Sequence, residues 1–150
     1  MAVAATTELA CINIMLAAIG EAPINSLVGT LPVDAVTAQS TLTEVNTRVQ
    51  SEGWSFNTET DVTFTRDGSN QINLPTNILR IDANIHQHPT IDPIQRGLKL
   101  YDRQNNKYEF DEDLICTVVY LRDFDEIPEP ARHYINIQAA RKFVDRLVSD

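Results

Sequence analysis

The spacing of the apolar residues changes twice along this chain, and this change constrains the fold more than any other feature of the sequence. Near both ends the apolar residues recur every three or four positions, whereas from Trp54 to about Arg122 they follow the period of two that is typical of strands. The sequence therefore predicts an α+β fold, with helices from the N- and C-terminal parts packed together and a central antiparallel β lobe. We expect one domain over residues 1–150: a helical part (1–53), the β lobe (54–122) and a C-terminal helix (128–150).

The first expected helix covers residues 7–19, with Thr6 or Thr7 placed to cap it and Gly20 placed to end it. Its apolar stripe is Leu9, Ile12, Leu16 and Ile19. Because most of the remaining circumference is also apolar, this helix must be buried on several sides, either by the core or by a neighbouring subunit.

Asp34 is expected to cap the second helix, which runs to Glu52 and stops at Gly53. Its buried stripe is Ala38, Leu42, Val45 and Val49, and opposite it lies a polar stripe without charge: Gln39, Thr43, Asn46 and Gln50. Two interpretations of the polar stripe remain open. It is either a solvated surface or a face packed against another copy of the chain, where uncharged groups cost less to desolvate than charges.

The middle of the chain predicts several strands. Apolar residues on either side of the turn 67–70 predict a hairpin between residues 62–64 and 72–74. Further strands are expected at 78–85, 98–101 and 114–121, with the last in a central position, a loop over 86–97 and a polar turn over 103–107.

The final helix is expected to begin near Glu129 and Pro130, since proline suits a first helical turn. It carries four of the chain's 12 basic residues: Arg132, Arg141, Lys142 and Arg146. In a chain with net charge −9, we expect these side chains to find acidic partners in the same chain, in a neighbouring copy or in another protein. The alternative is that they are ordinary solvated charges.

Acidic residues are dense between Glu109 and Glu129, where Asp111, Glu112, Asp113, Asp123, Asp125 and Glu126 are the candidate surface residues. The stretch lacks the central glycine and terminal glutamate of a calcium-binding loop. We interpret it as a solvated or partner-facing acidic surface. The alternative is a catalytic carboxylate pair, as in glycoside hydrolases.

No other pattern calls for a cofactor, a metal or nucleophilic catalysis. His86 and His88 could present two imidazoles, but no third ligand is evident. Cys11 and Cys116 lie in apolar runs and are expected to be buried free thiols. The excess of 21 acidic over 12 basic residues argues against a tight nucleic-acid binder and suits a passage along which DNA slides. No membrane span or signal peptide is expected, which predicts folding in the cytosol.

Three segments of the chain together resemble the tail tubular protein A family of podoviruses, the short-tailed phages related to the T7 group. They are LAAIGEAPI at 16–24, VNTRVQSEGWSFN at 45–57 and VYLRDFDEIPE at 119–129. The order and spacing of these segments match over nearly the whole chain.

This resemblance implies a structural virion protein and not an enzyme. It implies a subunit of a dodecameric ring in the neck of the virion, assembled in the host cytoplasm between the portal protein and the tail nozzle protein. DNA would pass through the lumen of the ring without specific binding. Family members typically continue beyond the position of Asp150, so a further C-terminal segment is expected. Some relatives are credited with carbohydrate-degrading activity, so a glycan hydrolase that uses carboxylates of residues 109–129 stays as the alternative function.

Overall fold

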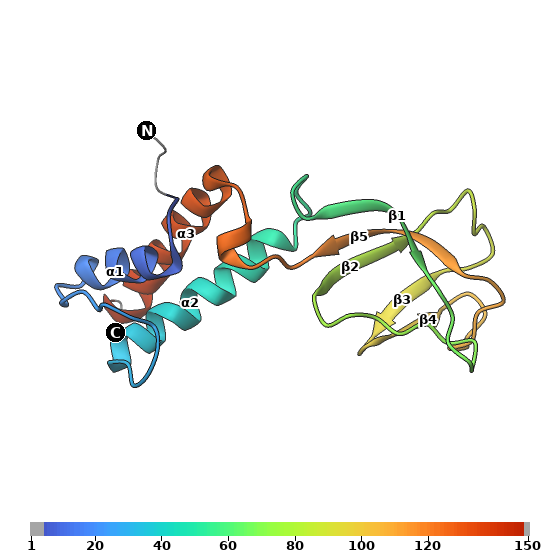
Figure 1. The fold of residues 1–150 in the computed structure, drawn as a ribbon, viewed down its shortest axis with the longest axis horizontal. Helices are drawn as coiled ribbons and strands as arrows, with labels where there is room; N and C mark the ends of the chain where they lie inside the picture. Colours follow the sequence, from blue (N-terminus) through green and yellow to red (C-terminus); the bar gives the residue numbers. More distant parts are fainter. Residues whose placement is uncertain (1–4, 149–150) are drawn as a thin grey trace. The chain divides into compact units, whose positions relative to one another are not determined.

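The computed structural model describes residues 5–148, and these form two compact units (Figure 1). One unit is helical and combines the chain up to Val49 with the chain from Asp123 onward. The other unit runs from Gln50 to Arg122 and contains the five strands. The α+β fold class predicted from the periodicity is confirmed, since the helices come from the two ends of the chain and the antiparallel strands from its middle.

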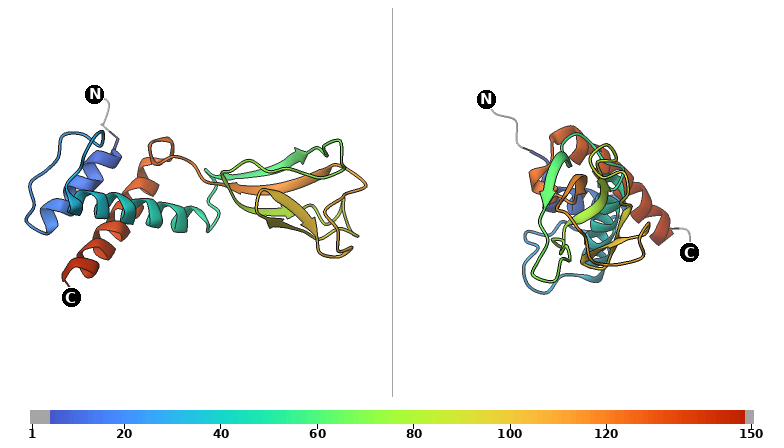
Figure 2. Two further views of the ribbon diagram at one scale, coloured as in Figure 1. Left: turned by 90° about the horizontal axis from the view of Figure 1, so that it is seen from below. Right: turned by 90° about the vertical axis from the view of Figure 1, so that its right-hand side faces the viewer.

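The helical unit contains α1 (Glu8–Ala18), α2 (Val33–Gln50), the short 3₁₀ turn η1 (Phe124–Glu126) and α3 (Glu129–Val148). The expected cap of the first helix is confirmed, because the Thr7 hydroxyl accepts a hydrogen bond from the backbone N–H of Ala10 at 3.0 Å. Gly20 ends that helix with φ of +77°, a conformation that favours glycine. Helix α1 packs against α3, and α2 crosses these two helices (Figures 1 and 2).

The core of the helical unit is built from the stripes that face inward on the three helices. Fourteen hydrophobic side chains are buried there: Cys11, Ile12, Met15, Leu16, Ala35, Ala38, Leu42, Val45, Val49, Phe124, Ile127, Ile135, Ala139 and Phe143. The buried stripe predicted for the second helix is among them. Burial raises the pKa of the Cys11 thiol to about 12, so this cysteine is an inert core residue, as expected.

The β unit holds a three-stranded antiparallel sheet in the order β1 (Thr58–Phe64), β5 (Leu114–Tyr120), β2 (Ile78–Ala83). The central position predicted for the strand at 114–121 is confirmed. A second antiparallel sheet pairs β3 (Pro93–Arg96) with β4 (Lys99–Asp102). The core of this unit contains Phe64, Ile72, Leu74, Ile78, Ile81, Leu100, Phe110, Leu114, Cys116 and Val118.

Two predictions about the β lobe are wrong. The turn at 67–70 forms, with the Asp67 carboxylate accepting backbone hydrogen bonds from Ser69 and Gln71, but it does not join a hairpin. Strand β1 pairs instead with β5, whose apolar, β-branched residues offer a longer buried partner. Residues 72–74 lie beside the start of β4 instead, and the Leu74 N–H donates to the carbonyl of Leu98, which directly precedes that strand, at 2.8 Å.

The segment 86–97 is not a loop throughout, because Pro93–Arg96 form strand β3. Pro93 is the first residue of this strand, a position that proline tolerates. The two-residue connection to β4 begins with Gly97 at φ of +63°, as a type II′ hairpin turn requires.

Candidate interaction surfaces

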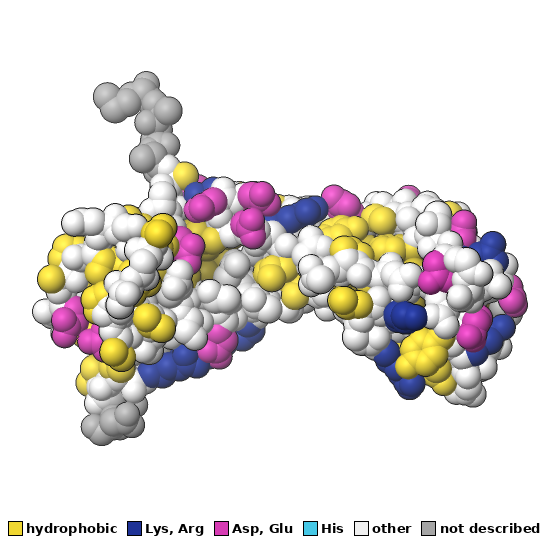
Figure 3. Space-filling view, turned by 60° about the horizontal axis from the view of Figure 1, so that its bottom comes forward, with side chains coloured by type: hydrophobic (Ala, Val, Ile, Leu, Met, Phe, Trp, Pro, Cys, Tyr) yellow, Lys and Arg dark blue, Asp and Glu magenta, His cyan; other side chains and the backbone are white. Residues whose placement is uncertain are grey.

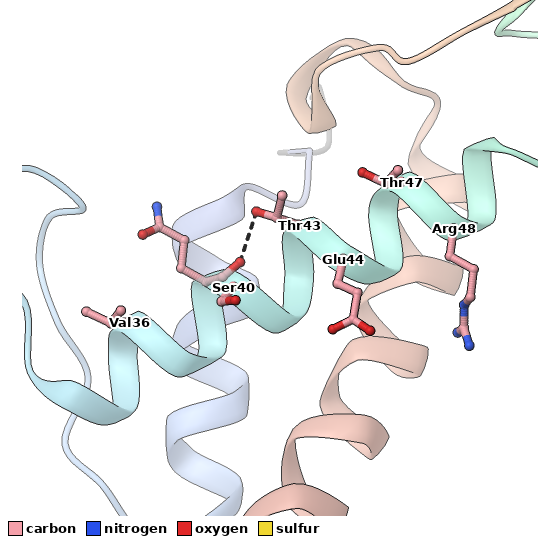
Figure 4. A pocket seen from close by; sticks show the side chains of 7 residues that line it. Val36, Ser40, Thr43, Glu44, Thr47 and Arg48 are labelled. Carbon is pink, nitrogen blue, oxygen red and sulfur yellow. Dashed lines mark hydrogen bonds between the residues drawn. The ribbon is translucent and has the colours of Figure 1, made fainter. Parts of the chain in front are cut away.

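The outward face of α2 is lined by Val36, Gln39, Ser40, Thr43, Glu44, Thr47 and Arg48, which together form a shallow groove (Figure 4). Small side chains occupy its middle, and Val36 is 50% exposed. The Thr43 hydroxyl donates to the backbone carbonyl of Gln39 at 3.0 Å, so its donor is already satisfied within the helix. A partner could therefore cover Thr43 at little desolvation cost, whereas the charged Glu44 and Arg48 also line the groove.

Of the polar stripe predicted on this helix, Thr43 is exposed, and Gln39 and Asn46 are half-buried. The Gln39 amide donates to a carboxylate oxygen of Glu8 on α1 at 3.3 Å. Thr43 is therefore the exposed member of the predicted stripe, and it lies in the groove with Ser40.

Gln50 was predicted on this face and is not there. Its side chain is fully buried, and both ends of its amide bind the backbone of Arg122, each at 2.8 Å. The Asn57 amide also donates to the Gln50 carbonyl at 2.8 Å. Gln50 is the last residue of α2 and the first residue of the β unit. Its side chain provides the hydrogen bonds that backbone groups just beyond the end of β5 need when they are buried.

Two of the four basic residues of α3 bind a single carboxylate of α2. Lys142 Nζ lies 2.5 Å from one oxygen of Glu44, and an Arg146 guanidinium nitrogen lies 2.7 Å from the other. These hydrogen bonds lower the pKa of Glu44 to about 2. Arg146 also donates to the Thr41 hydroxyl at 3.1 Å. The expected acidic partner exists, and it lies on α2 and not in the 109–129 stretch.

Arg132 is directed inward and not toward a partner. Its guanidinium donates to the backbone carbonyls of Ile127 and Thr6, each at 2.9 Å, and to that of Asp125. It thus ties the start of α3 to the segments on either side. Arg141 alone among the four is exposed without a hydrogen bond or ion pair to another residue in 5–148.

The acidic stretch 109–129 is divided between the two units. In the β unit, Asp113 binds the Arg66 side chain at 3.0 Å, Asp111 lies 3.7 Å from Lys107, and Glu112 lies 3.3 Å from His88. In the helical unit, Asp123, Asp125 and Glu126 are exposed, and within residues 5–148 their carboxylates form no ion pair or hydrogen bond.

A general acid of a glycoside hydrolase needs a carboxyl group with a raised pKa. The shifts here run in the opposite direction. Hydrogen bonds from the backbone N–H and side chain of Arg66 lower the pKa of Asp113. The side chain and backbone of Thr6 do the same to Glu129. These carboxylates are held in the charged form, which suits structural contacts better than proton donation.

His88, considered from the sequence as a metal ligand, is a buried side chain that binds the backbone. It is 3% exposed, and its Nε2 accepts the backbone N–H of Ile115 at 3.0 Å. His86 is exposed in the preceding turn. Within residues 5–148, no three His, Cys, Asp or Glu side chains are grouped to hold a metal ion. None of the helices in that range is both long and apolar enough to cross a bilayer.

Sequence reasoning missed a cluster on the β3–β4 sheet. The Arg96 guanidinium lies 3.7 Å from the centre of the Tyr101 ring, and Tyr108 meets that ring edge-on with centroids 4.9 Å apart. The available signal was the pair Gly97-Leu98 between alternating residues, which is typical of a two-residue hairpin loop.

The described residues thus define an α+β protein whose distinctive features are surfaces and not an enclosed polar pocket. The chain belongs to the tail tubular protein family, whose model, described as Tail tubular protein, matches residues 9–150. A search of curated proteins found no match. Membership in this family makes the chain a structural protein of the virion tail, and the family is structural and not enzymatic.

Proposed function

We propose that the chain is a subunit of an adaptor ring, a dodecamer by family resemblance, that joins the portal protein to the tail nozzle of a short-tailed phage. DNA would pass through its lumen during ejection. The observation that carries the proposal is the outward face of α2 on a protein of the tail tubular family. This face is a groove with small side chains in its middle, one of which, Thr43, already donates a hydrogen bond within its own helix. Such a face can be covered by a neighbouring copy at low desolvation cost.

Charge supports the second half of this proposal. The chain carries net charge −9, so a ring of twelve copies would repel a DNA duplex more than it holds it. Weak contact is the property that a channel for rapid DNA passage needs. We include Arg141 as a second surface position. It is the predicted partner-facing residue of α3 that is exposed and has no hydrogen bond or ion pair within residues 5–148.

The test places charge in the α2 groove. The double variant Ser40→Glu/Thr43→Glu is mixed with the portal protein encoded by the same genome, and the complex is measured by native mass spectrometry and negative-stain electron microscopy. We expect the wild-type chain to form a ring on the portal and the variant to fail, because unpaired charges buried at an interface cost several kcal/mol.

The matched control is Thr60→Glu/Thr65→Glu, which adds the same charge at two exposed positions of the β unit. It should assemble as the wild type does, and circular dichroism should show all three proteins folded. Normal ring formation by the Ser40/Thr43 variant would show that the groove is solvated. Absence of any ring with the wild-type chain would refute the adaptor function itself.

A further inference from the structure

We propose that the tip of the β3–β4 hairpin binds the acidic turn around η1 of a second copy of this chain. The hairpin tip is Arg96, Gly97, Leu98 and Lys99, and the acidic turn is Asp123, Asp125 and Glu126. The inference rests on the proposed ring function, and it names one contact through which neighbouring copies would be joined.

The hairpin tip places two cations directly opposite each other. Arg96 on β3 and Lys99 on β4 are cross-strand partners. Like charges in this position destabilise a sheet. Arg96 stacks on Tyr101 and forms no ion pair with a carboxylate within residues 5–148. Lys99 donates to the Gln71 side-chain oxygen, and its charge also acts on the Asp67 carboxylate. A hairpin tip that places Arg96 without an ion pair beside a second cation has a surface suited to an acidic partner.

The neighbouring side chains make this tip a rigid contact surface. Tyr101 lies diagonally across the hairpin from Arg96 and holds its guanidinium against the ring, so the N–H groups at the guanidinium edge stay available to acceptors. Tyr108 buttresses Tyr101, and Leu98 at the tip is 53% exposed. Figure 3 shows Lys and Arg side chains beside hydrophobic ones on the β unit. Arginine and tyrosine are the residue types that dominate binding energy at protein interfaces.

The acidic turn has the complementary properties. Its backbone is fixed, since the Glu126 N–H donates to the Asp123 carbonyl at 2.9 Å and Arg132 binds the Asp125 carbonyl. The three carboxylates are exposed, and the Asp123 side chain does not cap the turn. In contrast, Glu44 and Glu129 of the same unit are both engaged by hydrogen bonds. Three unpaired anions on a fixed backbone match the two adjacent cations of the hairpin tip.

A second copy is the partner that these observations favour. The two surfaces lie on different units of one chain, so a contact between copies is heterologous and passes from each copy to the next, which is the arrangement that closes into a ring. The exposed Leu98 and Tyr108 suit a protein surface better than a DNA backbone, which offers phosphates and sugars.

The experiment is a charge exchange, measured by sedimentation velocity in the presence of the portal protein from the same genome. The variants Arg96→Glu/Lys99→Glu and Asp125→Lys/Glu126→Lys should each weaken association between copies about tenfold or more, because like charges would then face each other. The variant that carries all four substitutions should recover most of the wild-type association. The control Arg80→Glu/Lys107→Glu makes the same change of charge elsewhere in the β unit. These two cations form only long ion pairs, Arg80 with Asp82 at 3.9 Å and Lys107 with Asp111 at 3.7 Å, so copies of the control variant should associate normally.

A single variant separates folding from binding. Arg96→Glu converts the like-charge pair with Lys99 into an opposite-charge pair, so its thermal midpoint should equal or exceed that of the wild type while its association is weakened. If the wild-type chain forms rings and both double variants associate as strongly as the wild type, this inference alone is overturned. Failure of the wild-type chain to form rings would overturn the proposed function with it. Loss of duplex DNA binding by Arg96→Glu/Lys99→Glu, with ring formation intact, would assign the hairpin to DNA instead.

Discussion

At the scale of single residues, buried polar side chains decide the local structure of the β unit. Asp102 is 1% exposed at the end of β4. One of its oxygens accepts the backbone N–H groups of Asp92, Gln104 and Asn105, and the other accepts the Asn105 side-chain amide at 2.6 Å. Burial by itself would raise the pKa of Asp102, but these four hydrogen bonds bring it below the ordinary value. The carboxylate thus holds the 103–107 turn together.

We predict that Asp102→Asn lowers the free energy of unfolding by about 1–3 kcal/mol, because an amide cannot accept all four hydrogen bonds. The control Asp111→Asn, at a side chain that is 92% exposed, should change it by less than about 0.5 kcal/mol. Urea denaturation at pH 7 measures both. Equal effects of the two substitutions would show that the Asp102 network adds nothing to stability.

At the scale of elements, one carboxylate joins two helices. Glu44 on α2 accepts hydrogen bonds from Lys142 and Arg146 on α3. Because Glu44 is exposed, the contact is screened by salt and contributes modestly. It nevertheless fixes where the two helices meet along their lengths.

We predict a pH-dependent difference between the wild type and Glu44→Gln. The folded-state pKa of Glu44, about 2, lies below the ordinary value of 4.5, so the contribution of its charge is complete above pH 4.5 and is lost as the pH falls toward 2. Thermal midpoints should therefore differ at pH 7 and converge between pH 4.5 and 2. The difference should also shrink at high salt. A constant difference across that pH range would show that Glu44 acts through packing and not through charge.

At the scale of the whole molecule, the chain forms two units that each have a hydrophobic core of their own. Phe143 is fully buried in the helical unit, and Phe110 is 1% exposed in the β unit. Units with separate cores commonly open as separate cooperative structures. In the proposed ring, this organisation would allow the helical unit and the β unit to contribute different contacts.

We predict that core truncations act mainly within their own unit. Phe110→Ala and Phe143→Ala should each cost about 3–5 kcal/mol. Hydrogen exchange should show reduced protection in β4 and β5 for the first substitution and in α1 and α3 for the second. If either substitution reduced protection equally over residues 5–148, the two units would form a single cooperative structure.

The sequence by itself determined that helices lie at both ends of the chain, where the first one ends and which stripe of the second one is buried, because these depend on residues close together in the chain. Gly20 and the Leu42 stripe could be assigned for this reason, whereas the cap expected at Asp34 is wrong, since α2 begins at Val33. The family also followed from the sequence, since its three segments are stretches of consecutive residues.

Only the tertiary structure decided which strands pair and which polar residues stay exposed. The partner of Phe64 is Leu114, fifty positions along the chain, and no local pattern specifies such a choice. Gln50 has the same uncharged side chain as Gln39, yet it is buried because the end of β5 brings two backbone groups to it. The adjacent cations Arg96 and Lys99 of the β3–β4 hairpin could not be recognised either, since which charges lie side by side depends on a strand pairing that only the folded chain shows.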